Sequence, residues 1–407
     1  MRRFKPFGCT VMGTEPAWYQ GLSTTFYDES HVAWREQLRS FVETELIPHA
    51  DEWDEAGGYP LELHQRAAAA GVYSLIGKTH CCGKPVDQFH VLVMNDELGR
   101  VASGGLIAAL FTAMAISAPI IAQWGTDAMK KHIVPEILAG RKLSALAVTE
   151  PSGGSDVANL HTTAVRDGRG NFVVNGAKKF ITGGLYADYL VTAVRTGGAG
   201  AGGVSLLLID GKSAGIRKTR IPTQGWWTSG TALLAFEDVV VPESNLIGQE
   251  NAGFLPIMMN FNQERFAGIC LAVRYMRICI EDSVAFARRR IIQGRPLIRA
   301  DLVQAKLARM ISLVEGIHAQ SESLALDIES GAEPRQVGVR TALLKVAATQ
   351  ALEVCAREAS QILGGASYQR TGPGARVERI YREVRVLAIG GGSEEALTLF
   401  AARGAKL

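Results

Sequence analysis

The sequence predicts an α+β protein, mainly helical, in which a helical region, a β region and a second helical region follow one another. Two changes in the spacing of apolar residues carry this prediction. Apolar residues recur at helical spacing over roughly the first 140 residues, and then short runs of β-forming residues alternate with turn residues as far as position 250. Helical spacing returns after Gly253, and each region is long enough to form its own core.

These changes of pattern divide the chain into segments. We expect a leader that need not be ordered, a helical domain, a β domain and a helical bundle, over residues 1–22, 23–142, 143–250 and 251–407, respectively.

Composition excludes several classes of protein. Lys and Arg number 43 against 40 Asp and Glu, and a net charge of +3 gives no reason to expect a nucleic-acid partner. The six cysteines form no CxxC pair, so we expect neither a disulfide framework nor a metal site, and reduced thiols favour a cytoplasmic protein. Residues 101–126 carry no charge, but Pro119 and several glycines favour buried helices over a membrane span.

The first region contains several stretches at helical spacing. Pro48 ends the first stretch and Gly71 ends the second. The predicted helices cover residues 31–47, 61–70, 95–100 with the uncharged stretch after it, and 128–138.

The β region begins with a strand-like run over residues 143–148. Asn175-Gly176 is a strong hairpin-turn signal between the runs 172–174 and 179–182. The glycine-rich segment 197–203 lacks the Lys-Ser/Thr of a phosphate-binding loop, so we expect a flexible hairpin loop there. Further strands are predicted over residues 189–194, 204–209 and 233–241.

The last region is predicted to form a bundle of long helices. Gly364-Gly365 and Gly390-Gly391-Gly392 separate the last three of them. The predicted helices cover residues 254–288, 301–330, 338–363, 377–388 and 394–403.

The densest polar and glycine-rich motif is the segment Val148–Asp156, which follows the first predicted strand. Its glycines would let a ligand approach the backbone closely, and exposed N–H groups can bind an anion or a polar ring edge. The same pattern also suits an ordinary loop, and it matches neither GxGxxG nor GxxxxGKS.

This motif resembles the T-E-P-x-x-G-S-D flavin loop of the acyl-CoA dehydrogenase family. The segments Gly294–Pro296, Gln361–Gly365 and Tyr381–Glu383 also resemble that family, in the same order, so that the resemblance covers residues 23–405. It implies the acyl-CoA dehydrogenase fold, in which a β-barrel-like middle domain lies between an N-terminal helical domain and a C-terminal four-helix bundle. It also implies FAD, and oxidation of an acyl-CoA thioester to trans-2-enoyl-CoA. A carboxylate would remove the α-proton while the β-hydride passes to flavin N5.

The catalytic base is the main departure from the common family pattern. Most members carry a Glu in a loop like I-Y-E-G-T, whereas Gly391 occupies that position here. The long-chain and isovaleryl-type subgroup instead places a Glu before an Arg on a helix, which matches Glu264-Arg265. The resemblance therefore implies Glu264 as base and the Gly391 N–H as donor to the thioester carbonyl. From the residues alone, a solvated helix face is the favoured position for Glu264.

The other site residues follow from the same resemblance. Phe180 replaces a common Trp and would lie flat on the flavin, although a strand aromatic in the core fits the residue too. The rival carboxylates Glu394 and Glu395 suit the first turn of a helix. Positions near the flavin ring are Leu146, Val148, Thr149, Ser155, Phe180, Thr182, Ser393 and Glu395. Positions near the substrate are Ser155, Asn262, Arg265, Gly391 and Gly392. Four positions would reach the FAD pyrophosphate or adenine of a neighbouring subunit: Arg290, Gln361, Gly364 and Gly365. A site shared in this way requires a homo-oligomer, and we expect a homotetramer.

Three functions are compatible with these residues. The first is a dehydrogenase of long-chain or branched acyl-CoA, such as an isovaleryl-like or citronellyl-CoA-like thioester, that passes electrons to an electron-transferring flavoprotein. The second is a flavin monooxygenase or oxidase on the same fold, against which Arg265 argues, because such relatives often lack the CoA-contacting Arg. The third is a helical scaffold without catalysis, since the common loop Glu is absent.

Overall fold

The computed structural model describes residues 1–76 and 80–405. Residue contacts divide the chain into two compact units. We call residues 1–50, 81–104 and 265–407 the helical unit and residues 51–80 and 105–264 the sheet unit. Each unit combines segments from more than one of the regions expected from the sequence. The boundary between the units in the long helix α9 falls between Glu264 and Arg265.

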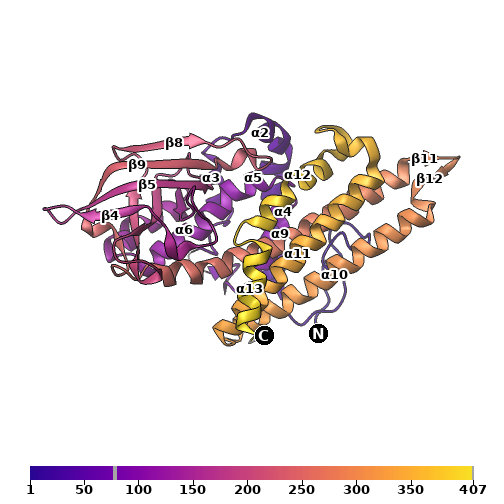
Figure 1. Cartoon of the computed structure of the whole chain (residues 1–407). Helices are drawn as coiled ribbons and strands as arrows, with labels where there is room; N and C mark the ends of the chain where they lie inside the picture. The colour runs from indigo at the N-terminus through magenta and orange to yellow at the C-terminus, as the bar shows by residue number, and fades with distance from the viewer. Residues whose placement is uncertain (77–79, 406–407) are drawn as a thin grey trace. The chain divides into compact units, whose positions relative to one another are not determined.

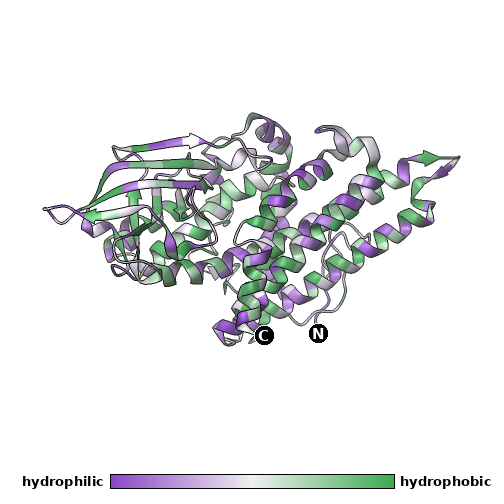
Figure 2. Cartoon of the chain, viewed as in Figure 1, coloured by the Kyte–Doolittle hydropathy of each residue, from purple (hydrophilic) through white to green (hydrophobic). Residues whose placement is uncertain are grey.

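The helical unit consists of long helices, of which α10 and α11 run side by side (Figure 1). Their apolar residues gather on one side, so green and purple residues alternate around both helices (Figure 2). The principal helices are α1 (Glu29–Phe41), α4 (Gln88–Gly99), α9 (Phe254–Arg289), α10 (Asp301–Glu329), α11 (Pro334–Leu363), α12 (Ala375–Ile389) and α13 (Glu394–Gly404). The sequence predicted all five helices after residue 250 close to these bounds.

Two short strands, β11 (Ile291–Ile292) and β12 (Arg295–Pro296), join α9 to α10. Gln293 and Gly294 between them have φ of 51° and 72°, the backbone of a two-residue hairpin turn. After α1, the chain continues through a π-helical turn over Val42–Leu46 and a 3₁₀ turn over Ile47–His49. The predicted helix 31–47 is therefore shorter as an α-helix than its apolar spacing indicated.

The leader over residues 1–22 is packed into the helical unit. Trp18 and Tyr19 are buried, and Glu15 accepts hydrogen bonds from Arg274 at 2.7 Å and Arg100 at 2.9 Å. Arg274 is fully buried and also binds the carbonyl oxygen of Thr14 at 3.1 Å. Burial alone would raise the pKa of Glu15, but Arg274 and Arg100 outweigh it and lower that pKa. The leader is thus held by a buried carboxylate.

The sheet unit contains a twisted sheet that runs in the order β10-β7-β6-β4-β5-β9-β8, with β3 beside β6. Most neighbouring strands are antiparallel, whereas β3 pairs parallel with β6. The strands are β3 (Ser144–Ala147), β4 (Thr163–Arg166), β5 (Phe172–Ile181), β6 (Tyr189–Arg195), β7 (Val204–Asp210), β8 (Ile216–Arg220), β9 (Ala232–Val241) and β10 (Leu246–Ile247). Strand β1 (His80–Cys81) spans a boundary between the two units, and β2 (Lys84–Pro85) lies in the helical unit.

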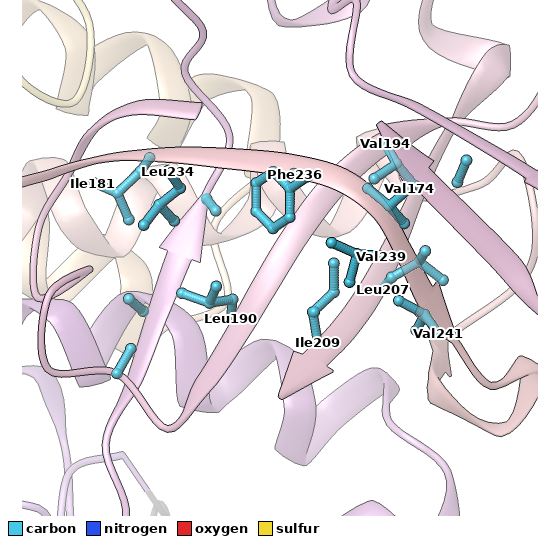
Figure 3. Packing of buried hydrophobic residues seen from close by; sticks show 14 of the residues in the cluster. Val174, Ile181, Leu190, Val194, Leu207, Ile209, Leu234, Phe236, Val239 and Val241 are labelled. Carbon is cyan, nitrogen blue, oxygen red and sulfur yellow. The ribbon is translucent and has the colours of Figure 1, made fainter. Parts of the chain in front are cut away.

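Apolar side chains from several strands fill one side of this sheet. Figure 3 shows Phe236 of β9 among the aliphatic side chains of the neighbouring strands, including Leu190 of β6 and Ile209 of β7. All three are at most 4% exposed, so they form a dry core beneath the strands.

The helices that lie wholly or almost wholly in the sheet unit are α2 (Ala50–Ala56), α3 (Leu63–Ala69), α5 (Gly104–Ile107), α6 (Ala113–Trp124), α7 (Asp127–His132) and α8 (Val134–Leu138). A π-helical turn, Ala108–Thr112, joins α5 to α6. Among the described residues, Gly104–Trp124 is the one helix long and apolar enough to cross a membrane, with a mean hydropathy of 2.1, but 72% of it is buried. That burial fits the core helix expected from the sequence.

The hairpin turn predicted at Asn175-Gly176 is wrong, because β5 continues through it opposite a bulge in β9. The Asn175 side chain donates to the Asp238 carboxylate at 3.0 Å and accepts from the Asp238 N–H at 2.9 Å. These cross-strand bonds hold the extra residue of β9 inside the sheet. The predicted hairpin loop over residues 197–203 does connect the antiparallel strands β6 and β7.

We expect Glu15→Gln to destabilise the helical unit by about 2 kcal/mol, because Arg274 and Arg100 lose a buried charged partner, although Asp96 still pairs with Arg274. Urea unfolding would measure this loss. Glu29→Gln, at an exposed position in the first turn of α1, is the control and should stay within about 0.5 kcal/mol of the wild type. Because the folded pKa of Glu15 lies below 4.5, its stabilisation is present above that pH and is lost as the pH falls further. An unchanged midpoint for Glu15→Gln at neutral pH would contradict the assigned role.

Candidate active site

The predicted flavin loop leaves the carboxyl end of β3 in the sheet unit. Leu146 lies in β3 opposite Val191, and Val148 is buried just after the strand. The Lys179 N–H donates to the Thr149 carbonyl at 2.8 Å, which ties the start of the loop to β5. Residues 151–156, including Ser155, are exposed, so the loop presents its backbone to the outside of this unit.

A buried ion pair fixes the shape of this loop. Lys178 is fully buried, and its Nζ donates to the Val148 carbonyl at 3.0 Å and to a Glu150 carboxylate oxygen at 2.8 Å. The same carboxylate accepts from the N–H groups of His161 at 2.6 Å and Thr162 at 2.8 Å. Burial opposes the charge, but Lys178 and these hydrogen bonds lower the pKa of Glu150 to about 2. Burial lowers the pKa of Lys178 to about 8, against the attraction of Glu150.

Phe180 lies at an irregularity of β5 that turns its ring outward. The pairing of β5 with β9 shifts between Lys178 and Ile181, and Phe180 has a left-handed φ of 62°. Its side chain is 56% exposed, so it is not the core aromatic that a regular strand would have made it. Thr182 lies two residues further along the chain and is half-buried. The exposed ring of Phe180 and the exposed flavin loop therefore belong to the same unit, and the hydrogen bond from Lys179 to Thr149 joins their segments.

The first three turns of α9 also belong to the sheet unit. Asn260 is buried and donates to the Ile116 carbonyl of α6 at 2.7 Å. Glu264 lies one helical turn further along the same face, and both Glu264 and Asn262 are half-buried. Glu264 therefore does not lie on a fully solvated helix face.

The glycine loop, residues 390–392, ends α12 in the helical unit. Gly391 and Gly392 have φ of 68° and 115°, a backbone that strongly favours glycine. Arg265 Nε donates to the Gly391 carbonyl at 2.8 Å, so two predicted site segments meet here. Lys345 of α11, which the sequence did not single out, also binds this loop.

The residues after the glycine loop form a helix start. Ser393 is the N-cap of α13 and accepts from the Ala396 N–H at 3.4 Å. Glu394 and Glu395 occupy the first turn, where the helix dipole favours negative charge. Backbone and Ser393 hydrogen bonds lower the pKa of Glu395, whose side chain is exposed. Both rival carboxylates thus have the structural role that their position predicted.

The four positions assigned to a neighbouring subunit's FAD all lie on exposed surface of the helical unit. Arg290 ends α9 beside the β11–β12 hairpin, and Gln361, Gly364 and Gly365 lie at the end of α11. Gly364 has a left-handed φ of 57°. Asp301 begins α10, where its charge favours the helix start.

Models of three acyl-CoA dehydrogenase domains match the chain in order. The N-terminal domain matches residues 28–141, the middle domain residues 145–239 and the C-terminal domain residues 251–406. The chain belongs to the acyl-CoA dehydrogenase family. This confirms the resemblance, the fold and the assignment as an FAD-dependent oxidoreductase of acyl-CoA.

Individual relatives agree with this assignment. The acyl-CoA dehydrogenase AFT10-1 of Alternaria alternata is 38% identical over 96% of this chain and 95% of its own length. The mitochondrial long-chain specific acyl-CoA dehydrogenase of Sus scrofa is 30% identical over 93% and 86%. The crystal structure of acyl-CoA dehydrogenase from Geobacillus kaustophilus is 29% identical, covers 95% of this chain and all of its own, and has a TM-score of 0.87.

The sheet unit has a donor set that fits a flavin. The exposed loop offers backbone N–H groups, and a Cβ built at Gly153 would meet nothing within 4 Å, which leaves room for close approach. The outward ring of Phe180 offers a flat apolar surface. The loop and the ring could therefore hold the polar edge and the face of a flat heteroaromatic group.

Sequence reasoning missed the two buried lysines that hold the site loops. Lys345 lies between buried Leu344 and Ala348 on α11, and a single Lys within an apolar stripe was the available signal there, because a buried ammonium must be paired or hydrogen-bonded. Lys178 is followed by Lys179 and had no such signal.

We expect Lys178→Met to loosen the flavin loop and to lower stability by about 3 kcal/mol, because Glu150 then stays buried without its cation. FAD retention on gel filtration and amide exchange over residues 148–156 would measure the first effect. Adding Glu150→Gln should recover part of the stability, with a coupling of about 1 kcal/mol or more. Lys212→Met, at an exposed lysine of the same unit, is the control. Strictly additive effects of the two substitutions would show that the pair is not coupled.

Proposed function

We propose that this enzyme dehydrogenates a long-chain or branched acyl-CoA at the α,β position with Glu264 as the catalytic base. The observation that carries the proposal is the backbone at Gly391, whose left-handed φ favours glycine where most of the family has its Glu. Glu264 is a half-buried carboxylate on the helix that the subgroup uses instead. Partial burial disfavours the charged form of a carboxylate and so makes it a better base.

The reaction divides into roles for residues of this chain. Glu264 would take the α-proton of the thioester. The Gly391 N–H would donate to the carbonyl oxygen as negative charge develops there, which stabilises the transition state. Arg265 and Asn262 would hold the CoA portion. Bound FAD would accept the β-hydrogen with its electron pair.

The flavin would be held mainly by the sheet unit. We assign the loop residues Thr149 and Ser155, the Phe180 ring and Thr182 to the isoalloxazine region. Arg290, Gln361, Gly364 and Gly365 would bind the FAD pyrophosphate and adenine of a neighbouring subunit, since Arg pairs well with phosphate. Their exposure supports this role.

The preference for long or branched chains and the electron acceptor also belong to this proposal. Similarity to the long-chain enzyme of Sus scrofa and to isobutyryl-CoA dehydrogenase of Bos taurus, at 27% identity, supports the substrate class. A structure of the electron transferring flavoprotein of Acidaminococcus fermentans contains a chain that is 25% identical, with a TM-score of 0.86, which supports such a flavoprotein as partner. Free, buried Cys270, Cys279 and Cys355 support a cytoplasmic location.

We expect Glu264→Gln to bind substrate and to slow flavin reduction by orders of magnitude, because the amide cannot accept the α-proton. Anaerobic mixing with a panel of straight and branched acyl-CoAs, followed by flavin absorbance, would measure the rate and identify the acyl group. Glu394→Gln, at the rival carboxylate, is the control and should reduce at the wild-type rate. Full-speed bleaching in Glu264→Gln would assign the base to another residue.

We further expect a homotetramer, because Ile291 and Ile292 are 54% and 48% exposed beside Arg290 and need cover. Light scattering should give four times 43.7 kDa. Arg290→Ala should lower FAD retention by the assembled protein without changing that mass. A monomer that retains FAD fully would contradict the shared site.

A further inference from the structure

The glycine loop has no side chains of its own to hold it. Three consecutive glycines follow α12, and glycine has more backbone freedom than any other residue. A loop that must aim one N–H at a substrate therefore has to be fixed from outside.

Two cationic side chains fix its carbonyl groups. Lys345 Nζ donates to the Ala388 carbonyl at 2.6 Å and to the Gly392 carbonyl at 2.9 Å, while Arg265 Nε donates to the Gly391 carbonyl at 2.8 Å. The Gly390 N–H donates to the Val386 carbonyl at 2.8 Å. The peptide groups on both sides of the Gly391 N–H are thus anchored, and Lys345 binds both the end of α12 and the far side of the loop.

The position of Lys345 explains how a buried ammonium is tolerated. The residue is 2% exposed, and burying a charge costs several kcal/mol unless it is paired or hydrogen-bonded. The last carbonyls of α12 lack intrahelical partners and carry the negative end of the helix dipole. Bonds from an ammonium to such carbonyls are charge-assisted and stronger than neutral ones. The loop and the lysine therefore stabilise each other.

We propose that Lys345 is a positioning residue for the dehydrogenation, and this rests on the function proposed above. It holds the glycine loop so that the Gly391 N–H is already oriented when the thioester carbonyl gains negative charge. Lys345 acts through the backbone and does not touch the substrate. An oxyanion donor of this kind raises the reaction rate by about 10²–10³-fold, and a donor that is less firmly held loses part of this gain.

Lys345→Met removes the ammonium and keeps an apolar chain of similar length. We expect FAD and substrate binding to change little, while the rate constant for flavin reduction falls about 10- to 100-fold. A bound 3-oxoacyl-CoA gives a second readout, since its enolate absorbs at long wavelength against the flavin. Its apparent α-proton pKa on the enzyme should be higher in the variant, because the carbonyl oxygen is less well bound. A residue that only stabilises the fold would leave that pKa unchanged.

Two further variants keep the test decisive. Thr341→Val, one turn earlier on α11, removes a buried hydroxyl that donates to the Val337 carbonyl of the same helix at 2.7 Å, and should leave both readouts unchanged. Lys345→Arg retains the charge and should restore part of the rate. If Lys345→Met does not fold, Lys345→Gln carries the same test, and the α-proton pKa must still rise.

Failure of this inference can be distinguished from failure of the proposed function. If wild-type flavin is reduced by no acyl-CoA, the proposed function is wrong. If the wild type is reduced but the lysine variants keep its rate and its α-proton pKa, only the role of Lys345 is overturned.

Discussion

Buried cations bonded to backbone carbonyls are the constraint on which the candidate site depends. Lys178 binds the Val148 carbonyl where the flavin loop begins, and Lys345 binds two carbonyls around the glycine loop. In the proposed site, both loops present backbone N–H groups to a ligand. A side chain that binds the carbonyl oxygens of a loop fixes the orientation of its peptide groups. A long side chain with a charged tip reaches such carbonyls from the core and leaves the outer surface of the loop clear for a ligand.

The exchange of Glu for Gly at position 391 is more than the loss of a carboxylate. The left-handed backbone at Gly391 brings its carbonyl to Arg265, the residue that follows Glu264. A glutamate at position 391 would carry a strain that glycine does not. The backbone of the glycine loop and the residue that directly follows Glu264 in the chain are therefore linked by a hydrogen bond.

The sequence predicted the long helices and most strands because their apolar spacing reports burial directly. Asn175-Gly176 failed because cross-strand bonds to Asp238, which no local pattern reveals, decided between a turn and a bulge. The family resemblance predicts Arg265 and Gly391 as site positions, but it did not predict their mutual contact. Lys178 and Lys345 were missed because composition cannot distinguish a surface lysine from a buried one that binds carbonyls.

The packing of the leader has an evolutionary consequence. The family model begins at residue 28, so Glu15 lies in a segment that the common domain pattern does not include. Arg274 also pairs with Asp96, which lies outside that segment. We infer that a homologue without the extension could keep Arg274, because Asp96 would still neutralise its buried charge.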